Sequence, residues 1–144
     1  LKLPKYIFCI GNYLTDWIGP EAANAEKLIP YRVTEKDDEI DSNIFHATID
    51  FQENAPIFRF YMGLDGWERP AANLPENQFF TLGAAGGTNS DTPVEFPDFK
   101  AGEQLTHKLA ETKDSFSFPN CSGVIEMTID LSNHDAPVAH FTAK

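Results

Sequence analysis

The sequence has few basic residues and few cysteines. Its 11 Lys and Arg residues stand against 22 Asp and Glu residues, so the formal net charge is −11. The basic residues are scattered and form no patch that could neutralise phosphates, which argues against nucleic acid and against an anionic membrane surface as partners. Two cysteines, Cys9 and Cys121, lie far apart and in no CxxC spacing. They are either two small buried side chains, which we favour, or a disulfide.

Long apolar runs are also missing. No window reaches the roughly 18 uninterrupted apolar residues of a membrane-spanning helix. No signal peptide is visible at the start. Because the chain starts at Leu1 rather than Met, an export segment or a lipid anchor upstream of these residues stays compatible with the sequence.

The patterns that mark common catalytic and cofactor sites are absent as well. The Gly-rich run 83–93 lacks both the Lys-Ser/Thr ending of a P-loop and the GxGxxG spacing, which predicts a flexible loop. The acidic segment 32–43 has no central Gly for an EF-hand, so solvated charge is favoured over a calcium site. No pair of the four histidines has zinc spacing, and no GxSxG appears. We therefore expect no metal, no cofactor and no enzyme activity, with a small hydrolase built on two carboxylates as a minor alternative.

Aromatic and β-branched residues are plentiful, and they alternate with polar residues at a period of two. Strands are predicted at 44–51, at 57–63 paired with 44–51, at 6–11, and at 123–131 forming a hairpin with 136–144. Shorter candidates lie at 78–83 and 115–119, and 20–29 suits one or two helical turns. The segment 99–114 is polar and is either extended or a short helix.

This pattern predicts one all-β domain over residues 1–144, an Ig-like antiparallel β-sandwich of about seven strands. The inward positions of the strands give the predicted core: Phe8, Ile10, Phe45, Ile49, Phe51, Phe58, Phe60, Ile125, Met127, Ile129 and Phe141.

The two tryptophans follow polar turns. Trp17 comes after "GNYLTD" and Trp67 after "GLDG". A Trp in such a place either closes the end of the sandwich or lies in a loop, where binding residues collect. An indole has a flat, negative face that complements the apolar C–H face of a sugar ring. Two exposed indoles set at an angle would match the curve of an α-glucan.

The segments "KYIFCIGNYLTDW", "NIFHATIDF", "IFRFYMGLDGW" and "SFSFPNCSGVIEMTIDLSNHDAPVAHF", in this order, resemble one module of the SusE/SusF-like outer-membrane lipoproteins of the Bacteroides starch-utilisation system. The resemblance implies a β-sandwich that binds carbohydrate without catalysis. By position, Trp17 and Trp67 would be the aromatic residues of the site. Arg59 stands where the family often has Lys, and Asn12 and Tyr13 would be neighbours.

The predicted function is therefore non-catalytic binding of a glycan, with starch or another α-glucan as the candidate, at the bacterial cell surface. The resemblance implies an exported, lipid-anchored protein of the outer membrane. Its partners would be an oligosaccharide or polysaccharide and other surface proteins of glycan uptake. The alternative is a structural or protein-interaction module that packs against other surface subunits through edge strands or long loops.

Overall fold

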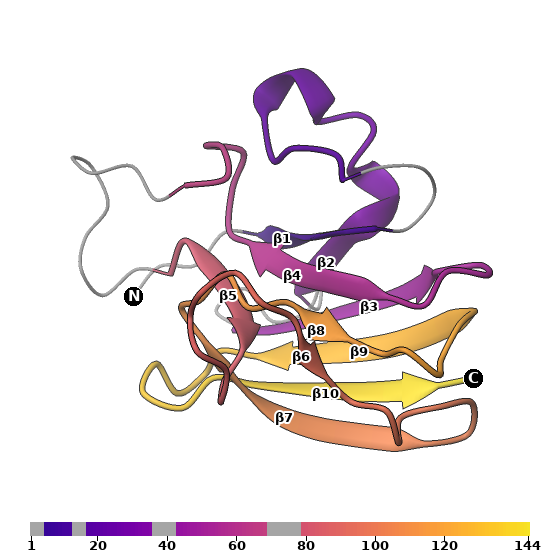
Figure 1. The fold of residues 1–144 in the computed structure, drawn as a ribbon. Coiled ribbons are helices and arrows are strands. Elements are labelled where there is room, and N and C mark those ends of the chain that lie inside the picture. The colour runs from indigo at the N-terminus through magenta and orange to yellow at the C-terminus, as the bar shows by residue number, and fades with distance from the viewer. Residues whose placement is uncertain (1–4, 13–16, 36–42, 69–78) are drawn as a thin grey trace.

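The computed structural model describes residues 5–12, 17–35, 43–68 and 79–144 (Figure 1). These residues form two 3-10 helices, η1 (Ala22–Asn24) and η2 (Ile29–Tyr31), and otherwise only strands. The strands are β1 (Tyr6–Gly11), β2 (Arg32–Glu35), β3 (Ile44–Asp50), β4 (Ile57–Tyr61), β5 (Thr81–Ala84), β6 (Val94–Glu95), β7 (Gln104–Ala110), β8 (Phe116–Ser117), β9 (Val124–Asp130) and β10 (Val138–Ala143). The predicted all-β class is confirmed.

The strands close into a ring rather than forming the predicted seven-stranded Ig-like sandwich. They follow one another in the order β1-β2-β3-β9-β10-β7-β5-β4, and β4 pairs back to β1, so eight strands make a closed barrel. Strands β8 and β6 continue from β4 as a short branch in front of the barrel (Figure 1). Closure removes the free edges that a two-sheet sandwich would leave.

The junction at β4 makes this closure possible. One edge of β4 pairs with β1, and its other edge is shared between β5, at Phe60↔Leu82, and β8, at Phe58↔Phe116. Gly11 lets β1 and β4 approach closely, because a Cβ at this position would collide with Ile57 and Phe58. The predicted pairing of 57–63 with 44–51 is wrong, since β3 pairs with β2 and β9.

The core confirms the period-two analysis. All eleven predicted core residues are buried. Phe58 is at the centre of an aromatic cluster, with ring centroids 5.4 Å from Phe118 and 5.6 Å from Phe116 and Phe141. The contact with Phe116 is stacked and the other two are edge to face.

The predicted hairpin at the C-terminal end is confirmed, because β9 pairs with β10 in antiparallel fashion. For the segment 99–114 the sequence allowed either an extended chain or a short helix. The structure shows the extended form, since the segment contains β7. The loop prediction for 32–43 is wrong at its start, where residues 32–35 form β2. The four acidic positions 37, 38, 39 and 41 lie outside the described residues.

Both cysteines are buried, and no disulfide joins them, in agreement with the favoured prediction. Burial raises the pKa of the Cys121 thiol. In the described part of the chain, no helix is long and apolar enough to cross a membrane.

Candidate functional site

The outward face of β4 is covered rather than open to solvent. Phe58 and Phe60 point into the barrel, so Arg59 and Tyr61 point outward by strand alternation. Both are nevertheless buried, with only 6 % and 0 % of their surface exposed. A pocket of about 400 Å³ lies over this face and is lined by Trp17, Ile57, Arg59, Trp67, Asp91, Pro93 and Ser115. The segment that carries Trp17, the segment that carries Trp67 and the Gly-rich loop cover β4 and form this pocket.

The two segments that carry the tryptophans are joined to each other. The backbone N–H of Gly66 donates to the carbonyl of Pro20 at 2.9 Å, and Glu21 and Asp65 form an isolated antiparallel bridge. Gly66 has a φ of 93°, a left-handed conformation that favours glycine. The "GLDGW" turn thus delivers Trp67 to the segment that follows Trp17.

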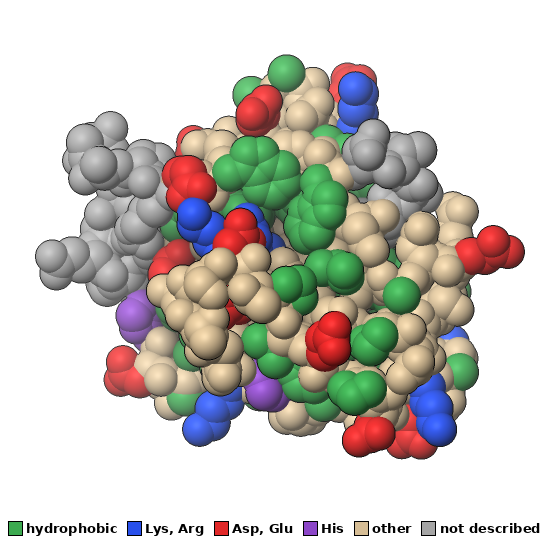
Figure 2. Space-filling model, in the orientation of Figure 1, with side chains coloured by type: hydrophobic (Ala, Val, Ile, Leu, Met, Phe, Trp, Pro, Cys, Tyr) green, Lys and Arg blue, Asp and Glu red, His purple; other side chains and the backbone are tan. Residues whose placement is uncertain are grey.

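The two indoles meet at the pocket. Their ring centroids are 6.3 Å apart and their planes are tilted by 57°. Figure 2 shows hydrophobic side chains gathered on this face, below the segment that rises between β1 and β2, with charged side chains beside them. The structure therefore brings together the two residues that the sequence analysis singled out.

The indoles differ in exposure. Trp17 is 39 % exposed, whereas Trp67 is half-buried and packs against the core. Trp67 meets Tyr61 edge to face, at 5.7 Å and 82°. Trp67 is thus fixed by its neighbours, and Trp17 offers a ring surface to solvent.

Arg59 forms the polar centre of the pocket. Its Nε and Nη2 donate to the phenol oxygen of Tyr61 at 3.1 and 2.9 Å, and Tyr61 donates in turn to the carbonyl of Trp67 at 3.0 Å. Nη1 donates to the carbonyl of Lys113 at 2.7 Å and to Asp91 Oδ1 at 3.0 Å. The guanidinium carbon lies 5.8 Å from the Trp67 ring centre, within cation–π range. These contacts fix the guanidinium, and Asp91 neutralises its charge.

A second ion pair lies beside Arg59. Lys113 Nζ contacts Glu68 Oε1 at 2.8 Å. Glu68 directly follows Trp67 in the chain. The hydrogen bond with Glu68 raises the pKa of Lys113. Because both side chains are substantially exposed, this pair contributes little to stability.

The Gly-rich loop that was predicted to be flexible is held by a buried carboxylate. Asp114 is 1 % exposed and accepts the backbone N–H groups of Asn89 at 2.6 Å and Thr92 at 3.0 Å. The loop in turn supplies Asp91 and Pro93 to the pocket. Sequence reasoning missed these three residues, because nothing in the local sequence indicates that "TKDS" and "NSDTP" meet.

Asn12 has a different position from the one expected. Its Nδ2 donates to the carbonyl of Ala55 at 2.9 Å, and its Oδ1 accepts the backbone N–H of Ile57 at 2.8 Å. The side chain continues the β1–β4 ladder and is not among the residues that line the pocket. Tyr13 lies outside the described residues.

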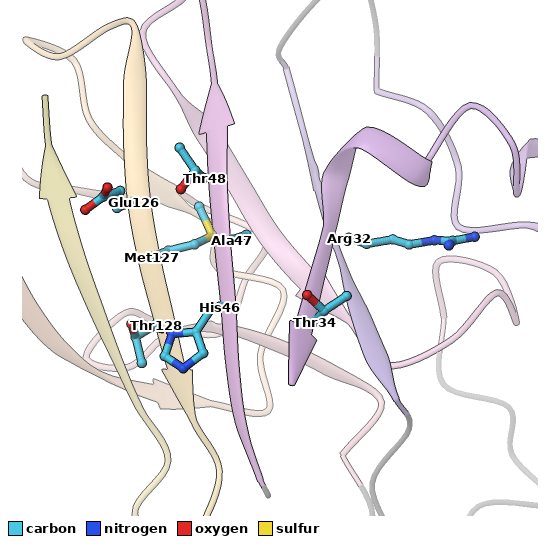
Figure 3. Close-up of a pocket in the computed structure, with 8 residues that line it drawn as sticks. All are labelled: Arg32, Thr34, His46, Ala47, Thr48, Glu126, Met127 and Thr128. Carbon is cyan, nitrogen blue, oxygen red and sulfur yellow. Dashed lines mark hydrogen bonds between the residues drawn. The ribbon is translucent and has the colours of Figure 1, made fainter. Parts of the chain in front are cut away.

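A second, more open groove of about 500 Å³ lies on the outer face of β2, β3 and β9 (Figure 3). In Figure 3, Arg32 extends away from the other labelled side chains, and its guanidinium carbon lies 4.3 Å from the Tyr6 ring centre. Glu126 pairs with Lys144 at 3.0 Å. Arg32 Nε and His46 Nε2 are buried without a hydrogen-bond partner among the described residues. Because the residues that line this groove include no Trp, Tyr or Phe ring, it is the weaker candidate for the predicted sugar site. The described residues contain no cluster of three or more His, Cys, Asp or Glu side chains that could hold a metal ion.

Comparisons with protein-family models, curated proteins and solved structures found no significant match to this chain. The resemblance to SusE/SusF-like modules therefore stays a prediction.

Proposed function

We propose that this chain binds a glycan without catalysis, through the pocket beside β4. The observation that carries the proposal is the pair of indoles, 6.3 Å apart and tilted by 57°, over a pocket that contains the Arg59–Asp91 ion pair. Aromatic faces next to a few fixed polar groups are the usual composition of a small-ligand site.

The chemistry of a sugar suits these groups. The C–H face of a sugar ring is apolar and slightly positive, so it stacks on the negative face of an indole. Trp17 supplies the accessible ring, and Trp67 supports it from below. The side chain of Asp91 is 65 % exposed, so its carboxylate can accept hydrogen bonds from ligand hydroxyls while it still holds Arg59.

The tilt of the indoles favours a curved chain. Two surfaces at 57° follow the bend of an α-glucan more closely than the flat ribbon of a β-1,4-glucan. We therefore name an α-glucan such as starch as the first ligand to test. Its affinity would be modest, because a flexible glycan loses conformational freedom when it binds.

The proposed setting comes from the resemblance to SusE/SusF-like modules. The chain would be part of a lipid-anchored protein at the bacterial cell surface. It would hold polysaccharide for other surface proteins of glycan uptake. It would not change the bound sugar chemically.

A protein-interaction module is the second candidate. Among the strands that the structure describes, β6 pairs only with β8 and is the last in the sheet order, so it leaves one edge for a partner strand. Hydrophobic side chains also continue from the upper part of this face toward its centre (Figure 2). A partner protein would use these features instead of, or next to, the indole pair.

The test is isothermal calorimetry with maltoheptaose, with cellohexaose as the β-linked control. We expect saturable binding of maltoheptaose that weakens by about tenfold, or about 1.4 kcal/mol, in Trp17→Ala. Ile29→Ala is the matched control, because Ile29 is also an exposed large apolar residue but does not line the pocket. Absence of binding by the folded protein to any neutral glycan would overturn the proposal and favour the interaction module.

A further inference from the structure

The loop 85–93 is held by hydrogen bonds from outside the loop as well as by its own side chains. Asn89 and Asp91 have φ values of 55° and 60°, in the left-handed region, which Asn and Asp adopt more readily than other non-glycine residues. The loop also contains adjacent glycines, which add conformational freedom. A loop with this freedom can adopt several conformations, and hydrogen bonds from the surrounding structure select one of them.

Asp114 provides that support from outside the loop. Its Oδ2 accepts the N–H of Asn89 and its Oδ1 accepts the N–H of Thr92, so one carboxylate holds both sides of Asp91. Thr112 adds a hydrogen bond from its hydroxyl to Asn89 Oδ1 at 2.7 Å. The loop comes so close to this carboxylate that a Cβ at Gly87 would collide with Oδ2.

Asp114 itself is held by its backbone. Its carbonyl accepts the N–H of Ala84 at 2.9 Å, and the next carbonyl, of Ser115, accepts the N–H of Val94 at 2.8 Å. Both ends of the loop are therefore tied to the segment that carries Asp114. The carboxylate is fixed in position, and the loop adapts to it.

The charge of Asp114 is satisfied by backbone dipoles. Of the neighbouring cations, Lys113 pairs with Glu68 and Arg59 pairs with Asp91. Burial alone would raise the pKa of Asp114, but hydrogen bonds from the backbone N–H groups of Thr92, Asn89 and Ser90 outweigh burial and lower the pKa below its usual value. The group therefore stays ionised and keeps accepting N–H groups near neutral pH.

The consequence lies in the pocket. Asp91 is between the two N–H donors that Asp114 holds, and its carboxylate contacts Arg59 at 3.0 Å. We propose that Asp114 is the positioning residue of the pocket, because its buried carboxylate holds the loop in the one arrangement that places Asp91 against Arg59. The effect on glycan binding rests on the proposed function, whereas the effect on the loop does not.

The first experiment needs no ligand. Amide exchange by NMR should show slow exchange for the N–H groups of Asn89 and Thr92 in the wild type. In Asp114→Asn, one acceptor oxygen becomes an NH₂ donor, so we expect these two amides to exchange at least about tenfold faster. The side-chain N–H groups of Arg59 should also exchange faster, because Asp91 is released. Asp135→Asn removes the same charge from a side chain that is 99 % exposed, and it should change none of these rates.

The second experiment links the loop to binding. Maltoheptaose affinity should fall by at least about tenfold in Asp114→Asn and stay unchanged in Asp135→Asn. If Asp114 acts through Asp91, the double variant Asp91→Asn/Asp114→Asn should lose no more affinity than Asp114→Asn alone. Near-UV circular dichroism of the Trp pair should be retained, which separates an opened loop from a disrupted pocket.

The outcomes distinguish the two proposals. Unchanged exchange at Asn89 and Thr92 in Asp114→Asn overturns the positioning role. Faster exchange with unchanged maltoheptaose affinity, or fully additive losses in the double variant, also overturns it. If the wild type binds no glycan, the proposed function fails. The exchange rates of the loop amides and of Arg59 then decide the positioning role by themselves.

Discussion

Two outward faces of the same barrel differ in what covers them. On β4, the outward residues Arg59 and Tyr61 are buried under the Trp segments and the loop 85–93. On the opposite arc, a row runs across five paired strands and consists of Thr34, His46, Thr128, His140 and Thr106. This row stays on the outer surface, and the groove at its β2–β3 end is open (Figure 3).

The polar groups of the two faces have different partners, and in the Thr/His row His46 Nε2 is buried without a hydrogen-bond partner in the described part of the chain. In the Thr/His row, neighbouring side chains contact one another, as at His46 Nδ1 and Thr128 Oγ1, 3.2 Å apart, and at Thr106 Oγ1 and His140 Nδ1, 2.9 Å apart. On β4, Arg59 is held by groups from the loops and from the segment before β8. Strand alternation is the same on both faces, so the covering loops account for the difference.

Arg59→Met should show the largest difference between the two faces. The change leaves the phenol of Tyr61, the carbonyl of Lys113 and the carboxylate of Asp91 without their shared donor. We expect a loss of about 2–4 kcal/mol in the free energy of unfolding, measured in urea. Lys108→Met, on the exposed side of β7, should change stability by less than about 0.5 kcal/mol. Equal losses in the two variants would show that the cover over β4 contributes nothing.

The two tryptophans should separate stability from binding. Trp67→Ala removes a half-buried ring that contacts Tyr61 and the core, so we expect a loss of about 2–3 kcal/mol in the free energy of unfolding. Trp17→Ala should cost less than about 1 kcal/mol, because Trp17 is the more exposed ring of the pair, at 39 %. Thermal unfolding of both variants checks the order. A larger loss for Trp17 would mean that Trp17 is the structural residue of the pair.

Acid should weaken the covered face first. The folded-state pKa of Asp114 is below its usual value, so its contribution to stability is present above the unfolded-state pKa and is lost as the pH falls through the folded-state pKa. We expect wild-type stability to decrease in this acidic range. Asp114→Asn should lack this part of the decrease, whereas Asp135→Asn should retain it. Urea unfolding at a series of pH values measures the difference, and parallel curves for wild type and Asp114→Asn would contradict it.

Thr128→Val should have the smallest effect. It removes one partly buried contact with His46 from the Thr/His row and keeps a β-branched side chain on the strand. We expect a change within about 0.5 kcal/mol in the free energy of unfolding. A loss of more than about 1 kcal/mol would show that the row holds β3, β9 and β10 together. The two faces would then be alike in their contribution to stability.

Features that depend on residues close together in the sequence were predicted, and features that depend on distant residues were not. The inward positions of β3, β4, β9 and β10 were predicted because alternation is a property of neighbouring residues. The β9–β10 hairpin was predicted because a short turn joins its strands. The pairing of β4 failed, since its partners β1, β5 and β8 are chosen by the whole chain.

The candidate site shows the same division. Trp17, Trp67 and Arg59 were named from turn context and from a family resemblance, and the structure places all three around one pocket. Asp91 and Asp114 were missed, because 22 residues or more separate Asp114 from the amides that it accepts. Asn12 was named for its place next to the Trp17 loop, but its amide group is used by the backbone of residues 55 and 57.

The sequence by itself determined that this is an all-β chain with a Phe-rich core, and it determined which side of each long strand faces that core. The cause is local: alternation of apolar and polar residues specifies a face wherever the strand lies. The tertiary structure alone decided that eight strands close into a barrel, that the outward face of β4 is covered, and that Asp114 holds the loop beside Arg59. These features depend on segments distant in sequence that meet only after folding.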